Sequence, residues 1–231
     1  SFGQVTAGLR KTAALLALAV MFTGCSAPAE SESGDALPDV VGSMDIRYAE
    51  QFSVDYLADG SALAEVADGR RYLIIPDGGE VPEQLPEDVT VISQPENIYL
   101  ASSSSMDLFS SLDCLGDILA SSTPESGWKL PEIAQAMADE DILYAGKYSS
   151  PDIELLMSEG CDLAIENMMI YHSPKTAEQI ESCGIPVFIE RSSAESHPLG
   201  RLEWVRLYGL MLGKSDEAEK FFSEKCSLLD E

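Results

Sequence analysis

The feature that most constrains the fold is a strand–helix–strand pattern that repeats between residues 150 and 189. Two Ser-Pro pairs, at 150–151 and 173–174, predict helix starts, because serine caps a helix N-terminus and proline suits its first turn. A glycine predicts the end of each helix, and apolar strands are expected at 163–165 and 185–189. Repeated βαβ units with short connections predict a parallel sheet flanked by helices.

The segments on either side of this pattern predict the remaining elements. Between 44 and 76, short apolar runs alternate with turn signals such as Asp68-Gly69, which predicts antiparallel hairpins. From 199 onward the spacing of apolar residues predicts helix, interrupted near Gly213. We therefore expect an α/β fold with N-terminal antiparallel hairpins and a C-terminal helix. From residue 89 the pattern becomes α/β, with strands expected at 89–92, 98–101 and 117–120 and a helix at 106–115.

The charge of the chain excludes one class of partner. There are 40 Asp and Glu residues against 14 Lys and Arg, a formal net charge of −26. Nucleic acid is a poor partner for such a chain, since phosphate binding requires clustered Lys and Arg. An anionic membrane surface would also repel it, so membrane attachment would need a lipid or a spanning segment. Solubility is the simpler explanation of the charge.

Residues 1–25 have the organisation of an export signal. Arg10 and Lys11 precede the apolar run 13–22, which is too short to span a bilayer but fits the hydrophobic part of a signal peptide. Phe22-Thr23-Gly24-Cys25 then places two small residues before a cysteine, which resembles a bacterial lipobox. We expect a diacylglycerol on Cys25; a buried cysteine after an N-terminal helix is the alternative. The small, acidic residues 26–39 indicate a flexible tether.

Open parallel sheets bind ligands beyond the carboxyl ends of their strands. This rule directs attention to three polar segments after predicted strands, at 102–105, 166–172 and 190–197. The sequence contains no GxSxG, GxGxxG, Walker A or HExxH motif, so no catalytic residues are predicted. With two histidines and no CxxC spacing, no metal site and no cofactor are predicted either, and an intact chelate is favoured over a bare metal ion. The cysteines after the lipobox are expected to be mostly buried thiols: Cys114, Cys161, Cys183 and Cys226.

Residues 146–222 resemble a known family. In order, this segment contains an aromatic residue (Tyr148), a helix with an acidic residue (Glu154), the strand DLAI at 162–165, a helix, the strand GIPV at 184–187 and a long helical segment. This order resembles that of the substrate-binding proteins of ABC importers for iron complexes and vitamin B12. The lipobox extends the resemblance to most of the mature chain. The hairpins between 44 and 76 are not general to that family, and with the segment 195–201 they indicate a subfamily.

The resemblance implies a two-lobed, class III solute-binding protein, in which a rigid helix joins two α/β lobes that close on a ligand. On this pattern, residues 1–24 are the signal peptide, 25–43 the lipid-anchor tether and 44–198 the N-terminal ligand-binding lobe. Residues 199–231 are expected to begin the helical connection, and the second lobe is expected to be absent from this sequence. The apolar side of the helix after Ser215 should then lie exposed, namely Ala218, Phe221, Phe222, Leu228 and Leu229.

The function implied by the resemblance is the delivery of a small ligand to an ABC permease and its ATPase. The ligand would be a chelated metal compound that is siderophore-, haem- or corrinoid-like. The protein is expected to be extracytoplasmic, lipid-anchored to the cell membrane and monomeric when full length, and to be neither an enzyme nor a binder of nucleic acid. Two other functions stay open: a structural or adhesive surface lipoprotein without a small-molecule ligand, and a hydrolase on the same sheet.

The resemblance also assigns roles to two residues. Tyr148 occupies the position of an aromatic residue that contacts the ligand, and a packing role at a strand end is its alternative. Glu154 is expected to be an exposed acid on the following helix that docks onto an arginine pocket of the permease. A solvated helix position without a partner is the alternative for Glu154.

Four further residues are candidates for contact with the ligand. Met169 and Tyr171 follow a strand and are expected to line an apolar cleft, although packing explains the methionine equally well. Arg191 and Ser193 belong to a dense polar set after a buried strand and are the candidates for polar ligand contacts. The alternative for this polar set is that Ser192 and Ser193 cap a helix and that Arg201 pairs with Glu195 or Glu203.

Overall fold

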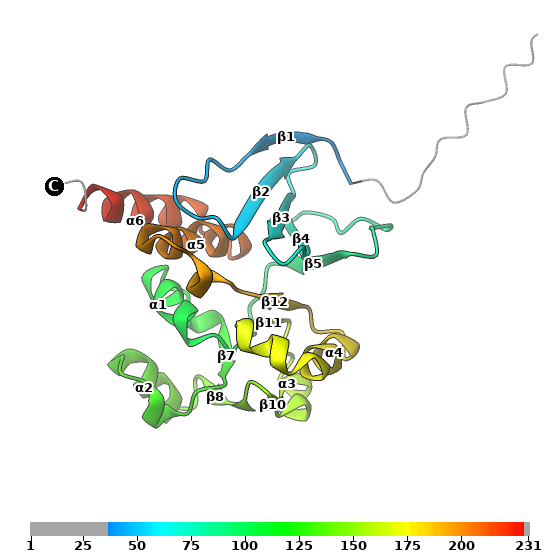
Figure 1. Ribbon diagram of the computed structural model, residues 1–231. Helices are drawn as coiled ribbons and strands as arrows, with labels where there is room; N and C mark the ends of the chain where they lie inside the picture. Colours follow the sequence, from blue (N-terminus) through cyan, green and yellow to red (C-terminus); the bar gives the residue numbers. More distant parts are fainter. Residues whose placement is uncertain (1–36, 229–231) are drawn as a thin grey trace, which may run out of the picture. The chain divides into compact units, whose positions relative to one another are not determined.

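The computed structural model describes residues 37–228 (Figure 1). The predicted signal peptide 1–24, the lipid anchor Cys25, the tether up to residue 36 and residues 229–231 lie outside the described residues. Among residues 37–228, none of the helices combines the length with the apolar character that a bilayer span requires.

The N-terminal sheet follows the predicted hairpins. Its strands, in spatial order, are β1 (Val40–Ser43), β2 (Phe52–Leu57), β3 (Ala62–Val66), β4 (Arg71–Ile75) and β5 (Val89–Ser93). The first three pairings are antiparallel, and β5 runs parallel to β4. Gly60 and Gly69 have φ angles of 88° and 87°, which only glycine adopts without strain, at the two tight turns. The hairpins predicted between 44 and 76 are confirmed.

Two boundaries at this sheet differ from the predictions. Val40–Ser43 was expected to belong to the tether, but it forms β1 and pairs with β2. Its side chains are exposed, which is why apolar patterning gives no signal for this edge strand. The strand at Val89–Ser93 joins the N-terminal sheet instead of the later α/β sheet, because its register pairs it with β4 from Arg71 to Ile75.

The second sheet is parallel throughout and confirms the predicted α/β class. Its spatial order is β12 (Val187–Ile189), β11 (Leu163–Glu166), β6 (Ile98–Leu100), β7 (Ile118–Ser121) and β8 (Leu143–Tyr144). The α-helices are α1 (Ser103–Ser111), α2 (Pro131–Ala138), α3 (Ile153–Ser158), α4 (Pro174–Ser182), α5 (Pro198–Met211) and α6 (Ser215–Ser227). Short 3-10 helices lie at Leu115–Asp117, Glu125–Gly127, Met168–His172 and Ser192–Ala194.

The two predicted helix starts have different outcomes. Ser173 and Pro174 begin α4 as predicted. Ser150–Pro151 instead forms strand β10, paired with β9 (Gly146–Lys147), so the helix begins two residues late. Asp152 is the N-cap of α3, and its Oδ1 accepts a hydrogen bond from Leu155 N at 2.9 Å.

The parallel sheet is buried on both faces. Leu163 and Ile165 of β11 belong to a core shared with α1, α5 and α6, whereas Ala164, which points the other way, packs with residues of α4. Strands buried on both sides need continuous apolar runs, and that is why the runs at 163–165 and 185–189 predict them. The expectation that the cysteines after the lipobox are mostly buried is confirmed. Cys114, Cys161 and Cys226 are buried, and Cys183 is half-buried.

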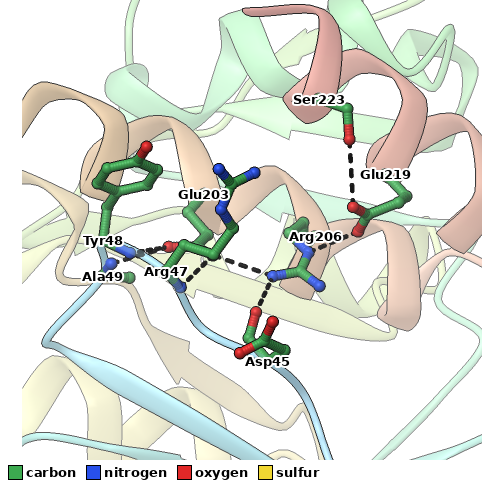
Figure 2. Close-up of polar contacts among 8 residues, drawn as sticks. All are labelled: Asp45, Arg47, Tyr48, Ala49, Glu203, Arg206, Glu219 and Ser223. Carbon is green, nitrogen blue, oxygen red and sulfur yellow. Dashed lines mark hydrogen bonds and ion pairs between the residues drawn. The ribbon is translucent and has the colours of Figure 1, made fainter. Parts of the chain in front are cut away.

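A buried glutamate on α5 holds the segment that leads into β2. Glu203 accepts hydrogen bonds from the backbone N–H groups of Arg47, Tyr48 and Ala49 at 2.8, 2.7 and 2.8 Å (Figure 2). Arg206, one helical turn further along, pairs with the same carboxylate at 2.9 Å and donates to Asp45 O at 2.6 Å. The N-terminal sheet is therefore tied to the C-terminal helices.

A second buried glutamate continues this contact. Glu195 accepts hydrogen bonds from the backbone N–H groups of Glu50 and Gln51 at 2.7 and 3.1 Å, and from Trp204 Nε1 at 2.8 Å. The alternative that Arg201 pairs with Glu195 or Glu203 is wrong, since both acids are occupied by these donors. Arg201 Nη2 instead lies 3.5 Å from the carbonyl oxygen of Ser193.

Helix α6 packs along α5. Ala218 and Phe222 are fully buried, so the expectation that they lie exposed is wrong: α5 packs along this face, and the ring of Phe222 also contacts Arg47 and Tyr48. Gly209 of α5 permits this contact: a Cβ atom there would lie 2.8 Å from Lys214 O. Leu228, at the end of α6, is 65% exposed.

Candidate ligand-binding cleft

A cleft of about 530 Å³ opens at the carboxyl ends of β6, β11 and β12. Its volume is in the range of small-molecule sites. All three polar segments that the strand-end rule selected contribute to it. The lining residues are Ser102, Ser103, Ser104, Asn167, Met168, Met169, Tyr171, His172, Glu190 and Ser193.

Glu190 supplies the charged group of the cleft. It follows β12 directly, and none of the residue's surface is exposed to solvent. Its Oε1 accepts hydrogen bonds from Ser102 Oγ at 2.6 Å and Ser104 Oγ at 2.8 Å, and its Oε2 accepts one from Ser192 N at 2.9 Å. The carboxylate is thus held by three neutral donors, two of which come from the segment after β6.

A buried hydroxyl pair lies beneath these serines. Ser105 Oγ and Tyr208 OH are 2.8 Å apart, and Ser105 Oγ is 3.5 Å from Ser102 Oγ. Burial, together with the negative charge of Glu190, raises the pKa of Tyr208 well above its ordinary value. The phenol therefore stays protonated and acts here as a hydrogen-bonding group that ties α5 to the start of α1.

A hydrogen bond from Tyr171 connects the rim of the cleft to the N-terminal sheet. Tyr171 OH donates to Asp68 Oδ2 at 2.6 Å, at the turn between β3 and β4, and accepts from Arg191 Nη1 at 3.1 Å. Arg191 Nε also donates to Gln51 Oε1 at 3.0 Å. Burial and the hydrogen bond to Asp68 raise the pKa of Tyr171. The hairpins thereby fix the orientation of an aromatic side chain at the cleft.

The predicted ligand contacts divide into three groups. Met169, Tyr171 and Ser193 line the cleft, and the first two are 50% and 42% exposed. Arg191 is not among the lining residues but contacts one of them, Tyr171. Tyr148 does not line the cleft; it is partly buried and packs against the core on the α4 side of the sheet.

Glu190, Asn167 and the serines after β6 also line the cleft, although the sequence alone did not single them out as ligand contacts. The signal for Glu190 was present, since an acid directly after a buried strand at 187–189 must be either paired or functional. Ser192 and Ser193 begin a 3-10 helix, and neither side chain caps it.

Glu154 lies on α3 and is exposed, as predicted. Leu156 on the same helix is buried, whereas Met157 is 55% exposed and does not share its face. Glu154 is not among the residues of the cleft.

Glu166 is a second buried acid, at the end of the neighbouring strand β11. It is fully buried, and neither carboxyl oxygen has a hydrogen-bond partner within residues 37–228. Burial raises the pKa of this carboxyl to about 8. Glu166 is not a lining residue of the cleft, and no group of three His, Cys, Asp or Glu side chains in the described part of the chain could hold a metal ion.

Comparison with known proteins gives three matches of note, while no protein-family model matches the chain. An uncharacterized lipoprotein from Methanocaldococcus jannaschii is 23% identical over 173 residues, which is 68% of this chain and 40% of that protein. The structure of the petrobactin-binding protein YclQ from Bacillus subtilis matches with a TM-score of 0.50 and 14% identity, over 74% of this chain and 52% of that one. A periplasmic binding protein from Veillonella parvula matches with a TM-score of 0.51 and 18% identity, over 65% of this chain and 51% of that one.

The chain spans about half of the two solved structures and 40% of the lipoprotein. At these identities the two structural matches bear on the fold. The α/β architecture that the sequence resemblance implied is confirmed by them. In fold, the described chain resembles a portion of bacterial solute-binding proteins, with its cleft at the carboxyl ends of the parallel strands.

Proposed function

We propose that this chain is the ligand-binding portion of an extracytoplasmic lipoprotein that captures a chelated metal compound and delivers it to an ABC importer. The observation that carries the proposal is the cleft at the ends of β6, β11 and β12, in a fold shared with a petrobactin-binding protein. Ligands bind at this edge in open α/β sheets. The compound would be siderophore-, haem- or corrinoid-like.

The composition of the cleft supports an intact chelate over a bare metal ion. A bare ion needs several ligands that converge on one point, and the described residues contain no such group. Met168, Met169 and Tyr171 instead supply apolar surface, which suits the organic shell of a chelate. We propose that the protein binds this compound without converting it chemically. The proposal includes a second lobe, which would form the other side of the cleft.

Membrane attachment through Cys25 is part of the proposal. Its support is the lipobox-like order of residues before Cys25, together with a relative in Methanocaldococcus jannaschii that is called a lipoprotein. Two acyl chains on one cysteine hold a protein at a membrane stably. This places the cleft outside the cytoplasm, where an importer receives its cargo.

Delivery would use Glu154. It is an exposed acid at the start of α3, on a helix that does not line the cleft. Opposite charges across an interface set orientation and association rate more than they set affinity for a third component. An arginine pocket on the permease, with its ATPase behind it, is the partner that we propose for Glu154.

Calorimetric titration of the full-length gene product with a panel of chelates tests the proposal. The panel contains ferric hydroxamate and catecholate siderophores, haem and corrinoids. Saturable binding of one class, with a dissociation constant in the micromolar range or below, is expected. The absence of binding to every member would reject the proposal and favour a structural lipoprotein, while turnover of an added ester or glycoside would favour a hydrolase.

A further inference from the structure

The most unusual group in the cleft is the carboxylate of Glu190, because nothing in the described structure neutralises it. Of the ten lining residues it is the one that carries a formal charge at pH 7, with histidine taken as neutral. None of the salt bridges within residues 37–228 includes it. A buried carboxylate without a cation is costly, and its hydrogen bonds to serine hydroxyls offset only part of that cost.

We propose that Glu190 recognises a positively charged group on the ligand, an ammonium or a guanidinium, and that the cleft selects cationic chelates over neutral and anionic ones. This inference rests on the proposed function and adds the charge class of the ligand to it. A ligand cation at Glu190 would neutralise the carboxylate, which no basic side chain of the described residues does.

The neighbouring basic groups do not take this role. Arg191 follows Glu190 in sequence, but its guanidinium donates to Gln51 and to Tyr171 OH, and its Cζ lies 5.9 Å from the Tyr171 ring. Its charge is therefore directed to the rim, where Asp68 accepts from the same tyrosine. His172 lines the cleft and is the remaining base there, without a hydrogen bond to Glu190 among the described contacts.

The hydrogen bonds of Glu190 leave room for a ligand donor. An ionised carboxylate accepts about four hydrogen bonds, two at each oxygen. Oε1 has two, from Ser102 and Ser104, whereas Oε2 has one, from Ser192 N. One acceptor position on Oε2 is thus unfilled by the described residues, in a side chain that is fully buried beneath the cleft, so a ligand cation would reach it after a shift of the serine side chains above it. Hydrogen bonds between two charged partners are about twice as strong as those between neutral groups.

The charge of the whole chain acts in the same direction. With a formal net charge of −26, the protein attracts cationic solutes over long range and repels anionic ones. A ferric tris-catecholate, which is strongly anionic, would meet both this field and Glu190. A chelate with a free amine would be favoured by both.

The test compares two ferric chelates that differ by one charge. Ferrioxamine B carries a free terminal ammonium, and N-acetyl ferrioxamine B carries a neutral amide at the same place. Both are titrated into the wild-type full-length gene product, into Glu190→Gln, and into the matched control Glu166→Gln, which changes a buried acid at the end of the neighbouring strand outside the cleft. We expect the wild type and Glu166→Gln to bind the cationic chelate about 10- to 100-fold more tightly than the acetylated one.

Glu190→Gln should reduce that preference to less than about threefold, because the amide keeps the size of the side chain and removes its charge. Equal binding of both chelates by the wild type would overturn the inference without use of any variant, and so would a preference that survives in Glu190→Gln. If neither form of ferrioxamine binds while haem, a corrinoid or a catecholate does, the inference is rejected and the proposed function stands. If no chelate of the wider panel binds, the proposed function itself is rejected.

Discussion

The contact between Glu203 and the segment 47–49 offers the sharpest test of how the two sheets are held together. The change is Glu203→Gln, which keeps the size of the side chain. In the structure Oε1 accepts from Arg47 N and Arg206 Nη1, and Oε2 accepts from Tyr48 N and Ala49 N (Figure 2). Whichever way the glutamine amide is oriented, its NH₂ group replaces an oxygen that accepts two hydrogen bonds.

The magnitude follows from these lost partners. Each buried donor left without an acceptor costs about 1–3 kcal/mol, so two of them give a loss of roughly 3 kcal/mol in the free energy of unfolding. For a domain of this size that loss lowers the melting temperature by about 6–12 °C. Glu219→Gln is the matched control: Glu219 pairs with the same Arg206 at 2.8 Å but its side chain is 53% exposed. An exposed pair is worth less than about 1 kcal/mol.

Urea unfolding followed by circular dichroism at pH 7 measures both variants. Amide hydrogen exchange at residues 47–49 adds a local measurement, since these amides should lose protection in Glu203→Gln before the rest of the sheet does. A Glu203→Gln protein within about 0.5 kcal/mol of the wild type would refute the reasoning. Equal losses in Glu203→Gln and Glu219→Gln would refute it as well, because burial would then make no difference.

Four further predictions address separate parts of the molecule. Glu166→Gln should raise the free energy of unfolding by roughly 4 kcal/mol at pH 8 and change it little at pH 4.5. Burial raises the pKa of the folded carboxyl to about 8, so the folded state keeps a proton that the unfolded chain releases. The wild type therefore loses about 1.4 kcal/mol of stability per pH unit between these two pH values. Gly209→Ala should destabilise the protein by about 1–3 kcal/mol in calorimetry, against the usual preference of helices for alanine, because its Cβ meets the backbone at Lys214. Cys25→Ala should remove all labelling of the protein in cells fed an alkyne fatty acid. Glu154→Lys should leave chelate affinity unchanged and lower stimulation of the importer's ATPase more than Glu154→Ala does.

Each of these has an outcome that would contradict it. If the free energy of unfolding of the wild type changes between pH 5 and pH 8 in parallel with that of Glu166→Gln, the Glu166 carboxyl is ionised in the folded state. A gain in stability in Gly209→Ala would mean that α5 and α6 are further apart. Equal labelling of wild type and Cys25→Ala would show that Cys25 does not carry the lipid. A loss of chelate affinity in Glu154→Lys would mean that α3 contacts the ligand.

The sequence predicted those elements that have a local signal. The hairpins before residue 76 have glycine turns with positive φ, and β11 and β12 are apolar runs bounded by turn residues, so both were found. Strand β1 was missed because its side chains are exposed, and α2 was missed because Leu130, at its N-cap, gives no capping signal. The late start of α3 depends on the pairing of β10 with β9, a contact that residue preferences at Ser150 and Pro151 do not encode.

The position of the cleft was predictable, while its chemistry was only partly so. The strand-end rule selected all three segments that line it, because topology alone fixes that edge of the sheet. Which side chains turn inward depends on contacts between distant segments. Arg191 is drawn to Gln51, 140 residues away in sequence, and Ser102 reaches Glu190 across 88 residues. The burial of Ala218 likewise follows from how α5 and α6 pack at Gly209.

The central claim, that the cleft at the ends of β6, β11 and β12 binds a small chelate, is tested most directly by blocking it. Ser193 lines the cleft and is exposed, so Ser193→Trp should fill the site without a change in the core; Ser53→Trp, at an exposed position on β2, is the matched control. The measurement is the dissociation constant, by calorimetry, of whichever chelate the full-length wild type binds. We predict a loss of affinity of at least about 100-fold in Ser193→Trp and wild-type affinity in Ser53→Trp. Unchanged affinity in a folded Ser193→Trp protein would contradict the claim and place the ligand elsewhere.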